Sequence, residues 1–286
     1  MKTTLRALLA SLVALGLLSA CSRSERASEP QAQSGTPVTV KGSDTMVQLG
    51  QRWAEDFMKQ TPGATIQVTG GGSGTGIAAL LNGTTHIAMS SRAIKEAESQ
   101  QLQTRHKTAA REIVVAKDGV TFYVPETNPL TALTLEQLKG IYLGDITHWK
   151  DVGGPDETIV VYSRENSSGT YAFVKEHLLG GQDFTPRALT LPGTAAVVNA
   201  VSKEKNGIGY GGAAYAKGIK ELKIKIGAEE IAPSQENIQS GKYPLSRDLF
   251  FYVRGEPTEA VKQFIDFALS PEGQRIVTQV GYFPVK

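Results

Sequence analysis

Cysteine is almost absent from this sequence, since Cys21 is the only one among 286 residues. A single thiol cannot close a disulfide within the chain or supply the paired cysteines of a structural zinc site. Histidine is also scarce, and His86, His106, His148 and His177 show no metal-binding spacing such as HExxH. We therefore expect no metal site and no cofactor, and acylation of Cys21, argued below, would leave no cysteine nucleophile.

An excess of charge of one sign is also missing. The chain has 30 Lys and Arg against 28 Asp and Glu. Lys2 and Arg6 lie in a segment that we expect to be removed, and 30 − 2 leaves 28 basic residues against 28 acidic ones. The balanced charge gives no basic footprint for nucleic acid, so any positive field must be local.

Long apolar runs are lacking too, and the run over 7–18 is too short to span a bilayer. Lys2 and Arg6 precede it and small residues follow, which is typical of an export signal over 1–20. The signal ends in LSAC, which resembles the lipobox of bacterial lipoproteins. This resemblance implies acylation of Cys21 and a lipid-anchored protein, periplasmic or at the cell surface. The alternative is an unmodified cysteine near a type I cleavage site.

Residues 21–36 are rich in Ser, Glu, Gln and Arg and have no large apolar side chain. Such a segment cannot bury enough surface to fold, so it is predicted to be a flexible tether. The remaining part, 37–286, is long enough for one large domain or two lobes.

Apolar patterns along 37–286 alternate between period two and helical spacing. Strands are predicted at 38–43, 65–70, 86–91, 158–163, 208–212 and 248–253, and helices at 45–60, 77–81, 135–143, 194–205 and 257–269. A further β-rich run over 111–129 is expected to break at Asp118-Gly119. Strands that alternate with helices indicate an α/β fold with a largely parallel sheet.

Three polar loops share one pattern, in which a strand leads into small hydroxyl and glycine residues and then a helix. They are GSDTM (42–46), GGGSGTG (70–76) and RENSSGT (164–170). The first N–H groups of a helix lack partners and carry partial positive charge, so three such ends together would bind an anion. Each loop taken alone is more often an ordinary helix N-cap than a site. None matches a P-loop or GxGxxG, so nucleotide binding is not indicated.

Arg164 is the most informative residue of these loops. A guanidinium stays charged at all relevant pH and binds tetrahedral oxyanions through two N–H groups. The alternative is an ordinary surface arginine, but the adjoining SSGT favours a site. Glu165 and Asn166 would then orient the guanidinium or face solvent.

The motifs GSDT, GGGSGTG, MSSR and RENSSGT, in this order, resemble the PstS-type phosphate-binding proteins that serve phosphate ABC transporters. LTLEQLKGIYLGDITHWKDVGG, PLSRDLFFYVRG and FIDFALSPEGQRIV extend the resemblance over essentially all of 38–286. It implies a monomeric type II periplasmic-binding-protein fold, with two α/β lobes joined by two crossing hinge strands. The expected lobes are 37–117 plus 247–286 and 118–246, with crossings near AKDGVTF and SRDLFF.

The resemblance also implies the ligand-binding positions, although the alignment of the first loop with the family can shift by one residue. They are Ser43, Asp44, Thr45, Ser73, Ser91, Arg164, Ser168, Gly169 and Thr170.

The sequence differs from the family pattern at one position, which concerns the group that accepts a hydrogen bond from the proton of hydrogen phosphate. Some members of the family have an aspartate where this sequence has Ser91, which Arg92 follows. A carboxylate only accepts hydrogen bonds and so rejects fully deprotonated sulfate. Our hypothesis is that Asp44 supplies this acceptor; the alternatives are that it is an N-cap of the helix at 45–60 or that it does both. Arg92 either pairs with a neighbouring carboxylate or adds a second cation.

The function implied by the resemblance is extracytoplasmic binding of inorganic phosphate and its delivery to an inner-membrane ABC permease. Closure of the lobes over the dehydrated anion involves no covalent chemistry, so we expect no enzyme. The alternatives are a binder of another oxyanion such as sulfate or molybdate, a secreted phosphatase, and a surface sensor without a transporter.

Overall fold

The computed structural model describes residues 36–285. The expected signal peptide, Cys21 and all of the tether except its last residue lie outside the described residues. Within 36–285 no helix is both long enough and apolar enough to cross a membrane.

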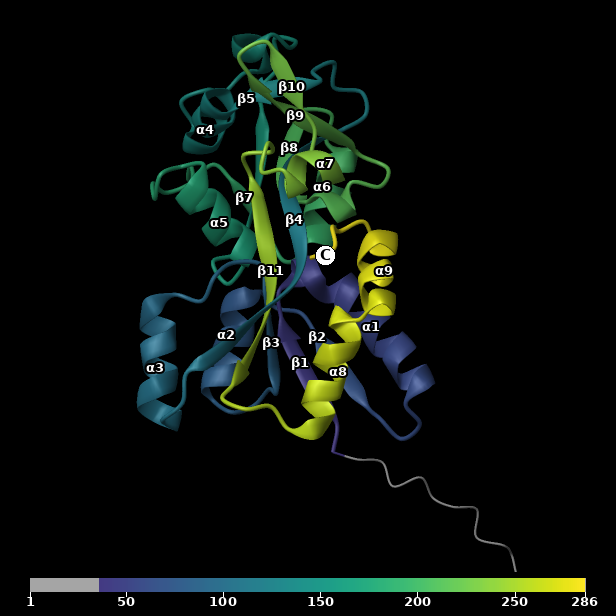
Figure 1. The fold of residues 1–286 in the computed structure, drawn as a ribbon. Helices are drawn as coiled ribbons and strands as arrows, with labels where there is room; N and C mark the ends of the chain where they lie inside the picture. Colours follow the sequence, from purple (N-terminus) through teal and green to yellow (C-terminus); the bar gives the residue numbers. More distant parts are fainter. Residues whose placement is uncertain (1–35, 286) are drawn as a thin grey trace, which may run out of the picture. The chain divides into compact units, whose positions relative to one another are not determined.

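The first of two lobes is built on parallel strands in the order β2-β1-β3 (Figure 1). Next to β3 lies β11, which is antiparallel to it, and next to β11 lies β4, which is antiparallel to β11. Residues on the two faces alternate: Met89 and Phe251 pack against α1, α8 and α9, whereas Ala88 and Phe250 pack against α2 and α3. The elements are β1 (Val38–Gly42), α1 (Val47–Gln60), β2 (Ile66–Thr69), α2 (Ser73–Leu81), β3 (Ile87–Ser90), α3 (Glu96–His106), β4 (Ala110–Val124), β11 (Ser246–Arg254), α8 (Glu259–Leu269) and α9 (Pro271–Val280).

The second lobe continues the sheet from the far end of β4 through β8, β6 and β7, while β9 also pairs with β4 and with two short strands. Its apolar core is separate from that of the first lobe and contains the aromatic cluster of Phe122, Tyr142 and Tyr210. The elements are β5 (Ala132–Thr134), α4 (Leu135–Leu143), β6 (Val160–Arg164), α5 (Gly169–His177), β7 (Leu189–Leu191), α6 (Thr194–Lys203), β8 (Gly207–Gly212), β9 (Lys220–Ile226), β10 (Glu229–Ile231) and α7 (Gln235–Gln239).

Two adjacent antiparallel strands, β4 and β11, pass from one lobe to the other (Figure 1). On β4, Ala116 belongs to the first core and Val120 to the second. On the other crossing segment, Leu249 of β11 belongs to the first core and Leu245, immediately before β11, to the second. The crossing therefore lies near residues 117–119 and 246–248. The exact lobe bounds, 37–117 plus 247–286 and 118–246, stay a prediction.

The predicted break at Asp118-Gly119 is wrong, since β4 runs without interruption from Ala110 to Val124. The Asp-Gly sequence does not form a turn here, because the Asp118 side chain is fully buried and pairs with Arg247 on the neighbouring strand. The helix expected at 77–81 begins earlier, at Ser73, so it includes much of the glycine loop. A capping box starts α4, because Thr134 Oγ1 accepts from the Gln137 amide and Gln137 Oε1 accepts from the Thr134 amide.

Candidate functional site

The first two polar loops meet where β1 and β3 end. The Gly72 amide donates to the Gly42 carbonyl at 3.0 Å, and the Ser43 amide donates to the Met89 carbonyl at 2.9 Å. Ser73 at the start of α2 contacts Ser91, whose amide donates to Ser73 Oγ at 3.0 Å. The carboxyl ends of neighbouring parallel strands thus gather these hydroxyl groups in one place.

The third loop joins them from the second lobe, after β6 ends at Arg164. Ser168 caps α5, since its Oγ accepts from the Tyr171 amide at 3.2 Å. The loop touches both loops of the first lobe: the Gly74 amide donates to the Ser167 carbonyl at 2.9 Å, and Thr45 Oγ1 lies 2.9 Å from Thr170 Oγ1.

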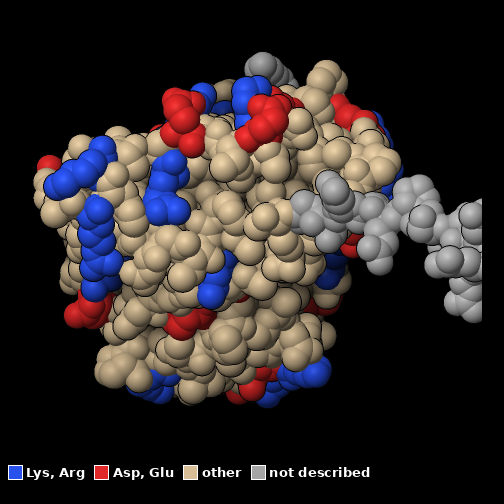
Figure 2. Space-filling view, turned by 90° about the horizontal axis from the view of Figure 1, so that it is seen from below, with Lys and Arg blue, Asp and Glu red and all other residues tan. Residues whose placement is uncertain are grey.

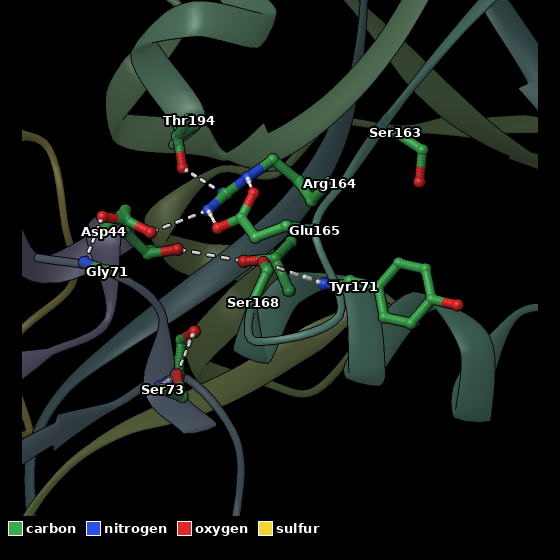
Figure 3. Close-up of polar contacts among 12 residues, drawn as sticks. Asp44, Gly71, Ser73, Ser163, Arg164, Glu165, Ser168, Tyr171 and Thr194 are labelled. Carbon is green, nitrogen blue, oxygen red and sulfur yellow. Dashed lines mark hydrogen bonds and ion pairs between the residues drawn. The ribbon is translucent and has the colours of Figure 1, made fainter. Parts of the chain in front are cut away.

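All nine predicted site residues lie in this one cluster, which Figure 3 shows in part. All but Asp44 are buried.

Arg164 is 1% exposed and is held on three sides (Figure 3). Its Nη2 donates to Asp44 Oδ2 at 2.9 Å and to Glu165 Oε1 at 3.0 Å, and its Nε donates to Glu165 Oε2 at 3.2 Å. Nη1 donates to Thr194 Oγ1 at 2.9 Å. These bonds use four of the five N–H groups of a guanidinium and leave one on Nη1 without a partner among the described residues.

Asp44 connects the lobes, since it comes from the first lobe and pairs with the arginine of the second. Its Oδ1 accepts from the Gly71 amide at 2.8 Å, and its carbonyl accepts from the Tyr215 hydroxyl at 2.8 Å. The alternative of an N-cap is wrong: Met46 occupies that position for α1, and the Asp44 carboxylate bonds to another loop instead.

Arg92 pairs with a neighbouring carboxylate, which was the first of the two alternatives considered for it. Its Nη1 and Nη2 bind the two carboxylate oxygens of Glu98 at 2.9 and 2.7 Å. Burial raises the pKa of Glu98, but hydrogen bonds and charge from Arg92 outweigh it, so the pKa lies below its usual range. Arg92 therefore anchors the start of α3.

Two glycines allow the loops to approach. A Cβ added to Gly169 would lie 2.2 Å from Ser73 Oγ and 2.6 Å from Ser91 Oγ. Gly72 has a φ of +92°, and a Cβ there would lie 2.5 Å from the Ser167 carbonyl oxygen. Any larger residue would hold the two lobes apart at these points.

The charged side chains of the site do not make it cationic, because one guanidinium faces the carboxylates of Asp44 and Glu165. Burial raises the pKa of Glu165, but hydrogen bonds and charge from Arg164 outweigh it and keep the pKa below its usual range. Positive potential comes instead from the N-termini of α2 and α5, both nine residues long, which begin within the cluster. The Ser43 hydroxyl is buried there with no hydrogen-bond partner among the described residues.

Sequence reasoning left open or missed several supporting residues. Glu165 orients Arg164, one of the two roles considered for it, whereas Asn166 is exposed. Thr194 was missed, although its position at the start of α6, after a strand and Pro-Gly, repeats the pattern of the three loops. No sequence motif around Tyr215 indicates a role in the site, because its contact is with Asp44, which is remote in the sequence.

Nothing in 36–285 groups three or more His, Cys, Asp or Glu side chains in a way that could hold a metal ion. On the face shown in Figure 2, charged side chains of both signs are interspersed.

The sequence and the fold both match known proteins. A family model described as a PBP superfamily domain matches residues 27–272. The phosphate-binding protein PstS of Pseudomonas aeruginosa is 33% identical over 263 residues, which cover 85% of this chain and 81% of that protein. PstS of Bacillus subtilis is 31% identical over 265 residues, covering 92% of this chain and 85% of that protein.

Among solved structures, one from Clostridium perfringens with bound phosphate, described as a candidate phosphate ABC transporter substrate-binding protein, matches with a TM-score of 0.81 and 32% identity. The match covers 88% of this chain and 100% of that one. The α/β architecture with two lobes and two crossing strands, predicted from sequence, is thereby confirmed as the type II periplasmic-binding fold. This chain belongs to the PstS family of substrate-binding proteins within the PBP superfamily.

Proposed function

We propose that this protein binds inorganic phosphate outside the cytoplasm and delivers it to an ABC permease. The observation that carries the proposal is the convergence of buried donors from both lobes around Arg164, which Asp44 of the other lobe holds in place. Relatives that carry the name phosphate-binding protein, and a similar structure with phosphate bound, support the choice of anion.

Phosphate would be held by groups that replace its water shell. The free N–H on Arg164 Nη1, the hydroxyls of Ser43, Thr45 and Thr170, and the first amides of α2 and α5 are the donors. A hydroxyl now turned toward another hydroxyl, as in the Thr45–Thr170 contact, can redirect its proton to the anion. Donors from both lobes favour the closed arrangement when the anion is present, which is the signal a permease can recognise.

Asp44 is proposed to select hydrogen phosphate over sulfate. Its carboxylate is the acidic group of the first lobe at this site, and both of its oxygens already accept hydrogen bonds from Gly71 and Arg164. Each carboxylate oxygen has a second lone pair, so Asp44 can also accept the proton of hydrogen phosphate. Sulfate has no proton to give and would meet this negative charge without compensation.

Calorimetry on the soluble fragment from residue 36 onward tests the proposal. Phosphate and arsenate, which both carry a proton near neutral pH, should bind tightly, while sulfate and molybdate should bind far more weakly. Tighter binding of sulfate or molybdate than of phosphate would overturn the choice of anion. Hydrolysis of a chromogenic phosphate ester by the purified protein, with or without divalent metal, would instead indicate an enzyme.

Anchoring through a lipid on Cys21 is a separate proposal, and it rests on the LSAC sequence and the polar segment that follows it. Incorporation of labelled palmitate in growing cells should be lost in Cys21→Ser, and the variant should leave the membrane fraction. Retention of label by Cys21→Ser would contradict the assignment. We also propose that the receptor acts as a monomer, which light scattering of the fragment would check.

A further inference from the structure

An ion pair marks the point where the two strands cross between the lobes. Arg247 of β11 lies directly opposite Asp118 of β4 in the strand register. Its Nε and Nη2 donate to Asp118 Oδ2 at 3.1 and 2.7 Å. The side chains are 3% and 0% exposed, so the pair is withdrawn from solvent. Because both residues lie on neighbouring strands, their pairing does not depend on how far apart the lobes stand.

The same guanidinium reaches into the phosphate site on the side of the first lobe. Arg247 Nη1 donates to the Ser91 carbonyl at 3.1 Å. Ser91 in turn donates its amide to Ser73 Oγ, so the arginine fixes the backbone of Ser91 beside Ser73. Both serines are among the ligand-binding positions expected from the sequence. This link also remains within the first lobe and its strands.

A third contact comes from the second lobe. The carbon of the Arg247 guanidinium lies 5.4 Å from the centre of the Phe173 ring, which is 7% exposed and belongs to α5. That distance is within the range in which a cation is attracted to an aromatic face. Phe173 is four residues beyond Gly169, where α5 begins in the site. The contact is thus made by the helix that brings the second lobe's donors to the anion.

A groove of about 350 Å³ separates the two lobes beside this contact, and it is lined by Arg92 and Lys95 on one side and by Glu176 and His177 on the other. Arg247 and Phe173 line the same groove. The contact between Arg247 and Phe173 joins the two lobes beside this groove, so it is placed to affect closure.

We propose that Arg247 is a positioning residue for phosphate binding: fixed by Asp118 and attached to Ser91, it receives Phe173 when the lobes close. The inference rests on the proposed function. Opening of the lobes would separate Phe173 from Arg247 while the bonds to Asp118 and Ser91 persist. The contact therefore contributes to phosphate affinity through the closed state alone, without touching the anion.

Phe173→Leu is the test variant, because it removes the aromatic face but keeps the buried ion pair and most of the apolar volume. Phe57→Leu is the matched control, since Phe57 is similarly buried, 6% exposed, but lies on α1 in the core of the first lobe. Calorimetry should show phosphate binding ~tenfold weaker in Phe173→Leu and unchanged in the control, with both variants losing thermal stability. Arg247→Lys, which keeps the charge, should weaken binding less than Arg247→Met.

Two outcomes separate the inference from the proposed function. If the wild type binds phosphate and Phe173→Leu binds it equally well, the positioning role is wrong and the function stands. If the wild type does not bind phosphate, the function is wrong, and small-angle scattering of the ligand-free proteins then decides the inference. A larger radius of gyration in Phe173→Leu than in Phe57→Leu would support the contact as a closure element, and equal radii would overturn it.

Discussion

Gly169 and Ser73 belong to different lobes, yet a methyl group on the first would overlap the hydroxyl of the second, with an ideal Cβ–Oγ separation of 2.2 Å. Gly169 does not have a positive φ, so alanine is compatible with its backbone and improves helix propensity at the start of α5. Gly169→Ala should therefore keep or slightly raise the melting temperature while weakening phosphate binding more than ~tenfold by holding the lobes apart.

Calorimetry and a thermal melt of Gly169→Ala together check this prediction. Unchanged phosphate affinity would mean that the lobes need not approach as closely as they do here.

Arg164→Ala should weaken phosphate binding at least ~tenfold, since a lost hydrogen bond to a charged group costs about 1.5–3 kcal/mol. The loss also leaves Asp44 and Glu165 facing each other without their cation, which adds repulsion toward an anion. Arg275→Ala on α9 removes an exposed arginine, paired only at 3.9 Å with Glu272, and is the control. Equal dissociation constants for the two variants would remove Arg164 from the site.

Asp44→Asn should reduce the preference for phosphate over sulfate, because an amide can donate a hydrogen bond to sulfate where a carboxylate cannot. Glu165→Gln is the matched control, as it removes one negative charge from the same guanidinium but lies in the second lobe. Competition calorimetry with both anions measures the ratio of affinities. A ratio that falls equally in both variants would assign the effect to local charge and not to Asp44 as acceptor.

The meeting of the three loops follows from patterns within the sequence. Strands that end in small polar residues and lead into helices place those residues at one edge of a parallel sheet, and Ser43, Ser73 and Ser91 lie there. The pairing of Arg164 with Asp44 could not be predicted from these patterns, since the two residues are 120 positions apart and only the folded chain brings them together.

Two errors of prediction have identifiable physical causes. Helix α3 was missed because only Leu102 among its residues is buried, so it lacks the apolar stripe by which helices are recognised. Its start is fixed instead by Glu98, which accepts from the Lys95 amide and binds Arg92. The break predicted in β4 failed because the buried partner of Asp118, Arg247, is remote in sequence.

Glu221, which lies outside the proposed phosphate site, makes the stability of the folded protein depend on pH. It lies on β9 opposite Tyr123 of β4, and its Oε1 is buried without a partner among the described residues. Burial, assisted by the charge of Asp118 and partly opposed by the neighbouring Thr121 hydroxyl, raises the pKa of Glu221 to about 7.

The folded protein thus keeps the Glu221 proton up to about pH 7, whereas the unfolded chain releases it near 4.5. Between these values the folded state binds more protons, so the free energy of unfolding falls as pH rises. The decrease is on the order of 2 kcal/mol after allowance for partial exposure. Glu221→Gln should melt higher than wild type at pH 8 and equally at pH 4.5, while the exposed control Glu126→Gln should follow wild type at both. If Glu221→Gln loses stability between pH 5 and 8 as steeply as wild type, the pH dependence arises elsewhere in the protein.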